Sequence, residues 1–175
     1  METTAARQLL SDDHHAVGDV LKQLLTALDN KDVRASYSRL DLLWARLAVH
    51  IRAEHLHLFP AVTKHLREAQ PIVEDLRTDH DFFMRELARA IAILRELPAS
   101  IVTASDEAKL DRVRTAVLEI EKRLITHNEI EESHIYRLSS TILTETEQSE
   151  LLARINAELE NRPPRFSEDA WTNCL

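Results

Sequence analysis

Histidine and glutamate side chains recur along this chain at spacings that suit metal coordination. Within each of two stretches, a histidine is followed by a glutamate at i+4 and by a second histidine at i+7, and a single histidine lies well before each stretch. On a helix, residues with this spacing share one face. Imidazole together with carboxylate suits iron, manganese or zinc better than calcium. The residues concerned are His14, His50, Glu54, His57, His80, His127, Glu131 and His134.

These polar residues fall on faces that are otherwise apolar. Leu43 and Leu47 precede His50 at helical spacing, and Val73 and Leu76 precede His80. A lone histidine in such a place is usually a core residue with its own hydrogen-bond partner. Six of these residues would each need such a partner, because buried polar groups are costly when unsatisfied. The six are His14, His50, Glu54, His80, His127 and Glu131. We therefore expect a bound metal to satisfy them together.

The pattern also occurs twice in the chain. Asp13-His14 precedes the first stretch and Asp79-His80 precedes the second, with 36 residues from His14 to His50 and 47 from His80 to His127. Each half thus offers one histidine from a first helix and a histidine–glutamate pair from a second. Two equivalent half-sites that face each other predict two metal ions. The remaining histidines lie off these faces and are expected to be exposed or half-exposed; they are His15, His55 and His65.

The elements that must position these residues are helices. One glycine, 44% hydrophobic residues and 5% aromatic residues favour a mostly helical protein. Apolar periodicity predicts long helices over residues 4–29, 33–68, 72–97 and 107–139, with a short fifth helix over about 144–160. Pro60 is expected to kink the second helix. The expected N-caps are Asp32, then Ser105 or Asp106, and a capping box from Thr144 to Glu147.

We accordingly expect an all-α protein, an up-down-up-down four-helix bundle with a short fifth helix and a C-terminal tail. The bundle would be one metal-binding domain over residues 1–160, and residues 161–175 would form the tail. The net charge of −8 argues against a nucleic-acid partner or an anionic membrane surface, and no apolar run is long enough for a membrane span. The single cysteine, Cys174, rules out a thiolate metal site or a disulfide within one chain. A cytoplasmic location is the expectation.

The motifs at these positions resemble those of the hemerythrin family, in the branch of HHE cation-binding domains. Four signatures occur in the family's order over about residues 9–159: Asp13-His14, His50-x-x-x-Glu54 ending in Leu-Phe-Pro, Asp79-His80, and His127-x-x-x-Glu131-Glu132. The resemblance implies a non-haem di-iron site in a four-helix bundle. Glu54 and Glu131 would bridge the two irons, His14 and His50 would bind one iron, and His80 and His127 would bind the other.

One departure from the oxygen-carrying members bears on function. These carry a fifth histidine one turn from the ligand of the third helix, but the neighbours of His80 at that spacing are Leu76 and Met84. Each iron would then have four protein ligands and two positions for an oxo or hydroxo bridge, water or a small ligand. Such a site is expected to bind, sense or reduce dioxygen, peroxide or nitric oxide. Whether it turns over as a di-iron oxidoreductase stays open, as do the native metal and any protein partner.

A second interpretation uses the same residues. Glu54-x-x-His57 and Glu131-x-x-His134 also match the pairs of ferritin-like di-iron bundles, either as an oxidase or as an iron-buffering protein. That fold needs a further glutamate on each of the other two helices, where this chain has His14 and His80. We rank this interpretation second, and expect His57 and His134 either to hydrogen-bond to the metal ligands or to be extra ligands themselves.

Overall fold

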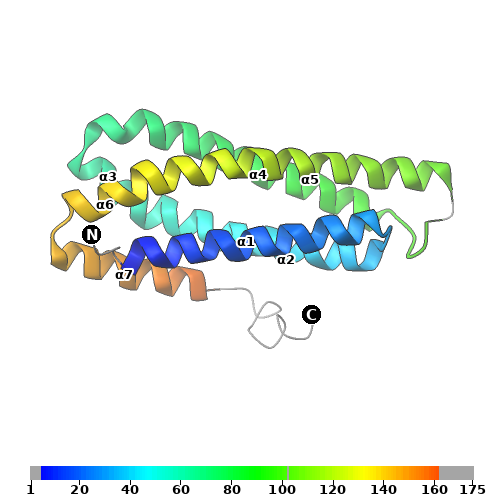
Figure 1. Ribbon diagram of the computed structural model, residues 1–175, viewed down its shortest axis with the longest axis horizontal. Helices are drawn as coiled ribbons and strands as arrows, with labels where there is room; N and C mark the ends of the chain where they lie inside the picture. Colours follow the sequence, from blue (N-terminus) through cyan, green and yellow to red (C-terminus); the bar gives the residue numbers. More distant parts are fainter. Residues whose placement is uncertain (1–4, 102, 162–175) are drawn as a thin grey trace.

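The computed structural model describes residues 5–101 and 103–161, and this part of the chain is helical without a strand (Figure 1). The elements in chain order are α1 (Ala5–Asp29), α2 (Val33–Ala53), the π-helical turn η1 (Glu54–Leu58), α3 (Phe59–His65), the 3₁₀ turn η2 (Arg67–Ala69), α4 (Gln70–Arg95), α5 (Ala104–Ile130), the π-helical turn η3 (Glu131–Ile135), α6 (Tyr136–Ile142) and α7 (Glu145–Glu160). The all-helical class predicted from the sequence is confirmed. Most of the predicted tail lies outside the described residues.

The long helices pack side by side as a bundle. Helix α1 contacts α2 and α5, and α4 contacts the same two helices. Helix α7 lies against α1, α2 and the turn η1, so it covers one end of the bundle (Figure 1). None of the helices in the described ranges is both long and apolar enough to cross a membrane.

Side-chain caps set the starts of three helices. Asp32 accepts a hydrogen bond from the backbone of Ala35, and Thr144 forms a capping box with Glu147, both as predicted. Helix α5 begins earlier than expected, because its cap is Thr103 rather than Ser105 or Asp106. Asp106 instead completes the capping box of Thr103, as the residue three positions into the helix. The prediction of the α5 cap was therefore wrong by two or three residues.

Each of the two metal-type stretches contains a π-helical turn that begins at its glutamate. The N–H of Phe59 donates to the carbonyl of Glu54, and the N–H of Tyr136 donates to the carbonyl of Glu131. A π-turn accommodates one more residue than an α-turn and is frequent at functional sites. Helix α3 follows with Pro60 in its first turn, where the missing N–H of proline is tolerated.

The extra residue of each π-turn changes which side chains face the core. An uninterrupted α-helix would bury His57 and Ala61, but Leu58 and Val62 are buried in their place. The second stretch shows the same shift of one residue; Ile135 and Ser139 are buried where His134 and Leu138 were expected. The predicted continuous faces beyond the two glutamates were therefore wrong.

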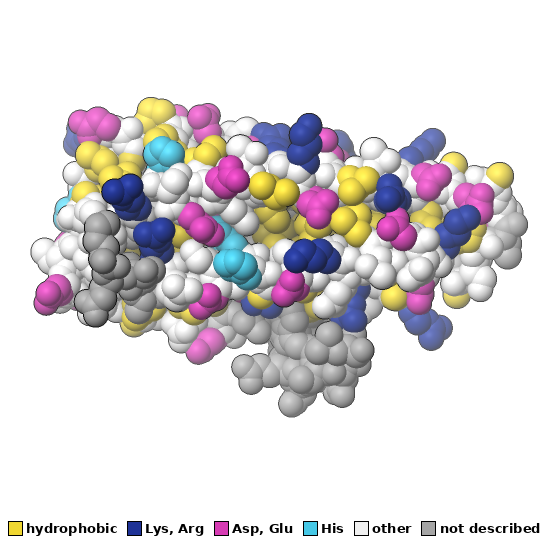
Figure 2. Space-filling view, in the orientation of Figure 1, with side chains coloured by type: hydrophobic (Ala, Val, Ile, Leu, Met, Phe, Trp, Pro, Cys, Tyr) yellow, Lys and Arg dark blue, Asp and Glu magenta, His cyan; other side chains and the backbone are white. Residues whose placement is uncertain are grey.

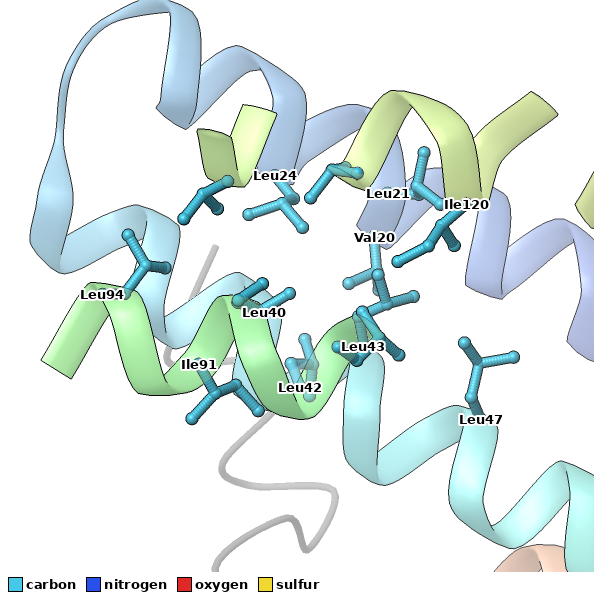
Figure 3. Close-up of a cluster of buried hydrophobic side chains, with 14 of the residues drawn as sticks. Val20, Leu21, Leu24, Leu40, Leu42, Leu43, Leu47, Ile91, Leu94 and Ile120 are labelled. Carbon is cyan, nitrogen blue, oxygen red and sulfur yellow. The ribbon is translucent and has the colours of Figure 1, made fainter. Parts of the chain in front are cut away.

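The apolar core consists of two clusters at different levels of the bundle. One cluster joins the parts of α1, α2, α4 and α5 nearest the first turn, where Leu24, Leu40, Leu43 and Leu94 converge (Figure 3). The other joins the opposite end, including Leu58 and residues of α7. Along α1, His14 lies between residues of the two clusters, and along α4, His80 does. On the face in view in Figure 2, acidic and basic side chains are interspersed.

Candidate metal centre

Six side chains meet in the polar layer between the two apolar clusters. All six are buried, and the two glutamates are fully so. They come from α1, α2, η1, α4, α5 and η3, so every long helix contributes. They are His14, His50, Glu54, His80, His127 and Glu131, the six residues that the sequence predicts as ligands.

The four histidines form two pairs whose inner nitrogens converge. In the first histidine pair, Nε2 of His14 lies 3.1 Å from Nε2 of His50. In the second histidine pair, Nε2 of His80 lies 2.9 Å from Nε2 of His127. The first pair joins α1 to α2, and the second pair joins α4 to α5. The repeat seen in the sequence is thus present as two similar nitrogen pairs.

Each glutamate presents one carboxylate oxygen to each histidine pair. Oε1 of Glu54 lies 3.5 Å from Nε2 of His50, and its Oε2 lies 3.4 Å from Nε2 of His80. Oε2 of Glu131 lies 3.2 Å from Nε2 of His14, and its Oε1 lies 3.1 Å from Nε2 of His127. Two carboxylates placed between two nitrogen pairs have the arrangement that bridging ligands require.

Two of these oxygens have no hydrogen-bond partner among the described residues. Oε2 of Glu54 and Oε1 of Glu131, both on the side of the second histidine pair, are buried without a donor. An unsatisfied buried carboxylate oxygen is costly, and a charged one more so. A cation bound between these oxygens and the second histidine pair would supply the missing interaction. The donor set, imidazole nitrogen with carboxylate oxygen, fits iron, manganese or zinc.

Carboxylates hold the outer nitrogens of two histidines. Nδ1 of His50 donates to Asp13 at 2.9 Å, and Asp13 also accepts from Arg46 at 2.6 Å. Burial alone would raise the pKa of Asp13, but the hydrogen bonds and charges of His50 and Arg46 outweigh it and lower the pKa to about 2. An outer N–H held by a carboxylate fixes the tautomer that leaves Nε2 free to coordinate.

The second half repeats this arrangement. Nδ1 of His127 lies 3.2 Å from Asp79, and Arg123 donates to the same carboxylate at 2.6 Å. The aspartates that precede His14 and His80 in the sequence therefore orient the histidine of the neighbouring helix, not the one beside them in the chain. Each Asp-His motif thus contains one candidate metal ligand, the histidine, and one aspartate that orients a candidate ligand on the next helix.

The outer nitrogens of the other two histidines have unlike partners. Nδ1 of His14 lies 3.0 Å from the half-exposed Glu132, and Nδ1 of His80 lies 2.9 Å from Nε2 of His55, also half-exposed. Sequence reasoning gave neither residue a part in the site. A signal was present, because each directly follows a central glutamate in the repeated motif. The equivalent positions hold a carboxylate in one half and an imidazole in the other.

Burial and neighbouring charges shift the pKa values of the central groups in different directions. Burial, with the nearby charge of Glu131, raises the pKa of Glu54. Burial would also raise the pKa of Glu131, but its contacts with His127 and His14 lower it well below the usual value. For His80 burial dominates and lowers the pKa well below the usual value, which favours the neutral imidazole that a metal requires.

The hydroxyl of Tyr136 also enters this layer. Tyr136 is fully buried, and its hydroxyl donates to Oε1 of Glu54 at 2.7 Å. Its ring stacks on that of His14 with centroids 5.5 Å apart. Burial and the two glutamate charges raise its pKa well above the usual value. The sequence analysis missed this residue, because the π-turn brings it to the core one position away from the expected face.

The remaining histidines lie away from the centre. Nε2 of His57 lies 3.8 Å from Glu158 of α7, and His134 is exposed beside Ser133. His15 is exposed, and its ring contacts the backbone of Ser11. Among the described residues, the contacts of His57 and His134 are with Glu158, Ser133 and the backbone of Ile130 and not with the six central residues, so the structure gives no support to their predicted place around the metal.

The chain matches the family model described as hemerythrin HHE cation binding domain over residues 5–139. No curated protein and no solved structure matches it. The matched range contains both histidine pairs and both glutamates, together with Asp13 and Asp79. Because the match covers well over half of the sequence and the structure is helical, the chain belongs to the hemerythrin HHE cation-binding domain family.

Proposed function

We propose that this protein holds a non-haem di-iron centre that binds, senses or reduces a small oxidant. The first histidine pair would bind one iron and the second pair the other, with Glu54 and Glu131 bridging. The observation that supports this best is the placement of the two carboxylates, each with one oxygen toward each histidine pair. The family supports metal binding in general, and the donor set fits iron, manganese or zinc. The choice of iron follows from the resemblance of the motifs to those of hemerythrins.

The arrangement of the long helices, which we take to be an up-down-up-down bundle, suits this role. It brings one donor or donor pair from each helix to a single layer, with apolar clusters on both sides. The aspartates fix the rings of His50 and His127, so the ligand nitrogens are held in place before a metal arrives. When bound, iron would supply electrons and open coordination positions for dioxygen, peroxide or nitric oxide.

The ferritin-like interpretation gains no observation in its favour. It requires His57 and His134 at the metals, and these side chains lie elsewhere. It also requires a carboxylate from α1 and from α4 at the centre, where His14 and His80 occupy those positions. A binding or oxidant-reducing site of hemerythrin type is therefore the function that the geometry favours.

The test combines metal analysis with oxygen kinetics. Protein purified without added metal is expected to contain about two irons per chain, and His50→Ala to lose most of that iron. His15→Ala, a change to an exposed histidine, is the matched control and should retain it. Stopped-flow spectra of the reduced protein mixed with oxygen then separate the functions. A stable, reversible adduct indicates binding, whereas turnover with an added reductant indicates an oxidoreductase. Wild-type protein that binds no iron, or His15→Ala that loses as much as His50→Ala, would overturn the proposal.

A further inference from the structure

The hydroxyl of Tyr136 lies among all four donor atoms of the first half of the centre. Its oxygen is 2.7 Å from Oε1 of Glu54 and 3.0 Å from Nε2 of His14. It is also 3.3 Å from Oε2 of Glu131 and 3.5 Å from Nε2 of His50. These are the four side chains that could hold a metal ion in this half. The hydroxyl is therefore close to every one of them at once.

These separations match the spacing of neighbouring ligands around one metal. Donor atoms about 2.1 Å from an ion and at right angles to each other lie about 3.0 Å apart. Three contacts between neighbours among the four have that size: 3.1 Å between His14 and His50, 3.2 Å between His14 and Glu131, and 3.5 Å between His50 and Glu54. The hydroxyl oxygen has the same spacing to each of the four. It has the place of an apex above a base of four donors.

We infer that Tyr136 is a fifth protein donor to the metal bound by the first histidine pair, an inference that rests on the proposed di-iron function. The phenol O–H bond breaks as the ion binds, its electron pair stays on oxygen and forms the bond to the metal, and the proton leaves to water. The hydrogen bond from the hydroxyl to Glu54 is replaced by this shared coordination.

Within the part of the chain that the structure describes, the second half of the centre has no such donor. Phe59 occupies the position equivalent to Tyr136, directly after its π-turn, and its ring stacks on His80 as that of Tyr136 stacks on His14. Phenylalanine has no atom that could bind a metal. The carboxylate oxygens on this side are also the two that have no hydrogen-bond partner. The two metals are thus inequivalent, with five protein donors at one and four at the other.

This inequivalence changes what each metal can do. A six-coordinate ion in the first half would have one remaining position, whereas an ion in the second half would have two. The symmetric count of two open positions per iron, expected from the sequence, is replaced by an uneven one. An incoming small molecule would then bind at the side of His80 and His127.

Resonance Raman spectroscopy of the ferric, full-length protein tests this inference without relying on activity. A phenolate bound to ferric iron gives a visible charge-transfer band, and excitation in that band enhances tyrosine ring vibrations. The chain has two tyrosines, which makes the assignment direct. Tyr37 lies on α2, bonded to Arg95 away from the centre, and Tyr37→Phe is the matched control.

Wild-type protein with two ferric ions by elemental analysis should show these vibrations, and so should Tyr37→Phe. Tyr136→Phe should lose them while it still binds two ions. If Tyr136→Phe does not fold or bind iron, ring-deuterated tyrosine in Tyr37→Phe decides, because isotope-shifted bands can then arise only from Tyr136. Absence of tyrosine bands in wild-type protein that holds two ferric ions overturns the inference alone. Absence of bound iron overturns the proposed function, and the inference with it.

Discussion

Replacing Asp13 with asparagine removes a buried negative charge on which two partners depend. The Asp13 side chain is 7% exposed, accepts two hydrogen bonds from Arg46 and accepts a third from Nδ1 of His50. Those partners lower its pKa from 3.8 to about 2 against the effect of burial. The folded metal-free protein therefore favours the ionised carboxylate over the protonated one more strongly than the unfolded chain does.

The pKa shift gives the size and the pH range of the effect. At about 1.4 kcal/mol per pKa unit, the ionised carboxylate contributes on the order of 2 kcal/mol to the free energy of unfolding. Because the folded pKa is the lower one, this contribution is complete above the unfolded value of 3.8 and is lost as the pH falls toward 2. The difference in stability between wild type and Asp13→Asn should therefore be largest at neutral pH and shrink below about pH 4.

Urea unfolding of the metal-free proteins at pH 7 and pH 3 measures this difference. With a slope of about 2 kcal/mol/M, Asp13→Asn should unfold at about 1 M lower urea at pH 7. Asp79→Asn is the matched control, since Asp79 has equivalent partners but is 19% exposed, and its loss should be smaller. Equal midpoints for wild type and Asp13→Asn at pH 7, or a difference that is undiminished at pH 3, would refute the argument.

Three further outcomes are expected. Removal of metal should lower the melting temperature, because a ligand bound only by the folded state stabilises it; identical melting of loaded and stripped protein, with metal content verified, would contradict this. His57→Ala should leave the metal content unchanged whereas His127→Ala should reduce it sharply, since of these two rings only that of His127 faces the centre; elemental analysis of both variants decides. Thr103→Ala should cost about 1 kcal/mol of stability through loss of the α5 cap, measured by urea unfolding. No change for Thr103→Ala would mean that the cap contributes nothing there.

Much of the fold follows from sequence periodicity because α1 and α4 are uninterrupted helices. In these, a histidine in an apolar row must face the core, and His14 and His80 do so. The repeated motif also predicted that His50 and His127 face the core, and both are buried, since they precede the π-turns. The starts of α2 and α7 could also be predicted, because a helix cap needs only residues that are neighbours in sequence.

The residues that follow Glu54 and Glu131 could not be placed from the apolar periodicity, because that periodicity assumes an uninterrupted α-helix. A period of 3.6 residues carried through Glu54 and Glu131 places His57 and His134 inside, but each π-turn adds one residue and turns them away. The same shift brings Tyr136 to the core. His55 was expected on the outside as a half-exposed residue, yet it reaches His80 because the outer nitrogen of a buried ring still needs a partner.

The polar layer between the two apolar clusters also bears on how the metal-free chain unfolds. A single continuous core makes a small domain lose its structure in one cooperative step. Here six buried polar side chains lie between the two ends. Two carboxylate oxygens among them, Oε2 of Glu54 and Oε1 of Glu131, lack a donor among the described residues. Without a cation, the two unpaired oxygens weaken this layer, so we expect it to couple the two clusters less than an apolar layer would. The two ends should then open as separate units in amide hydrogen exchange, and a bound metal should merge them into one.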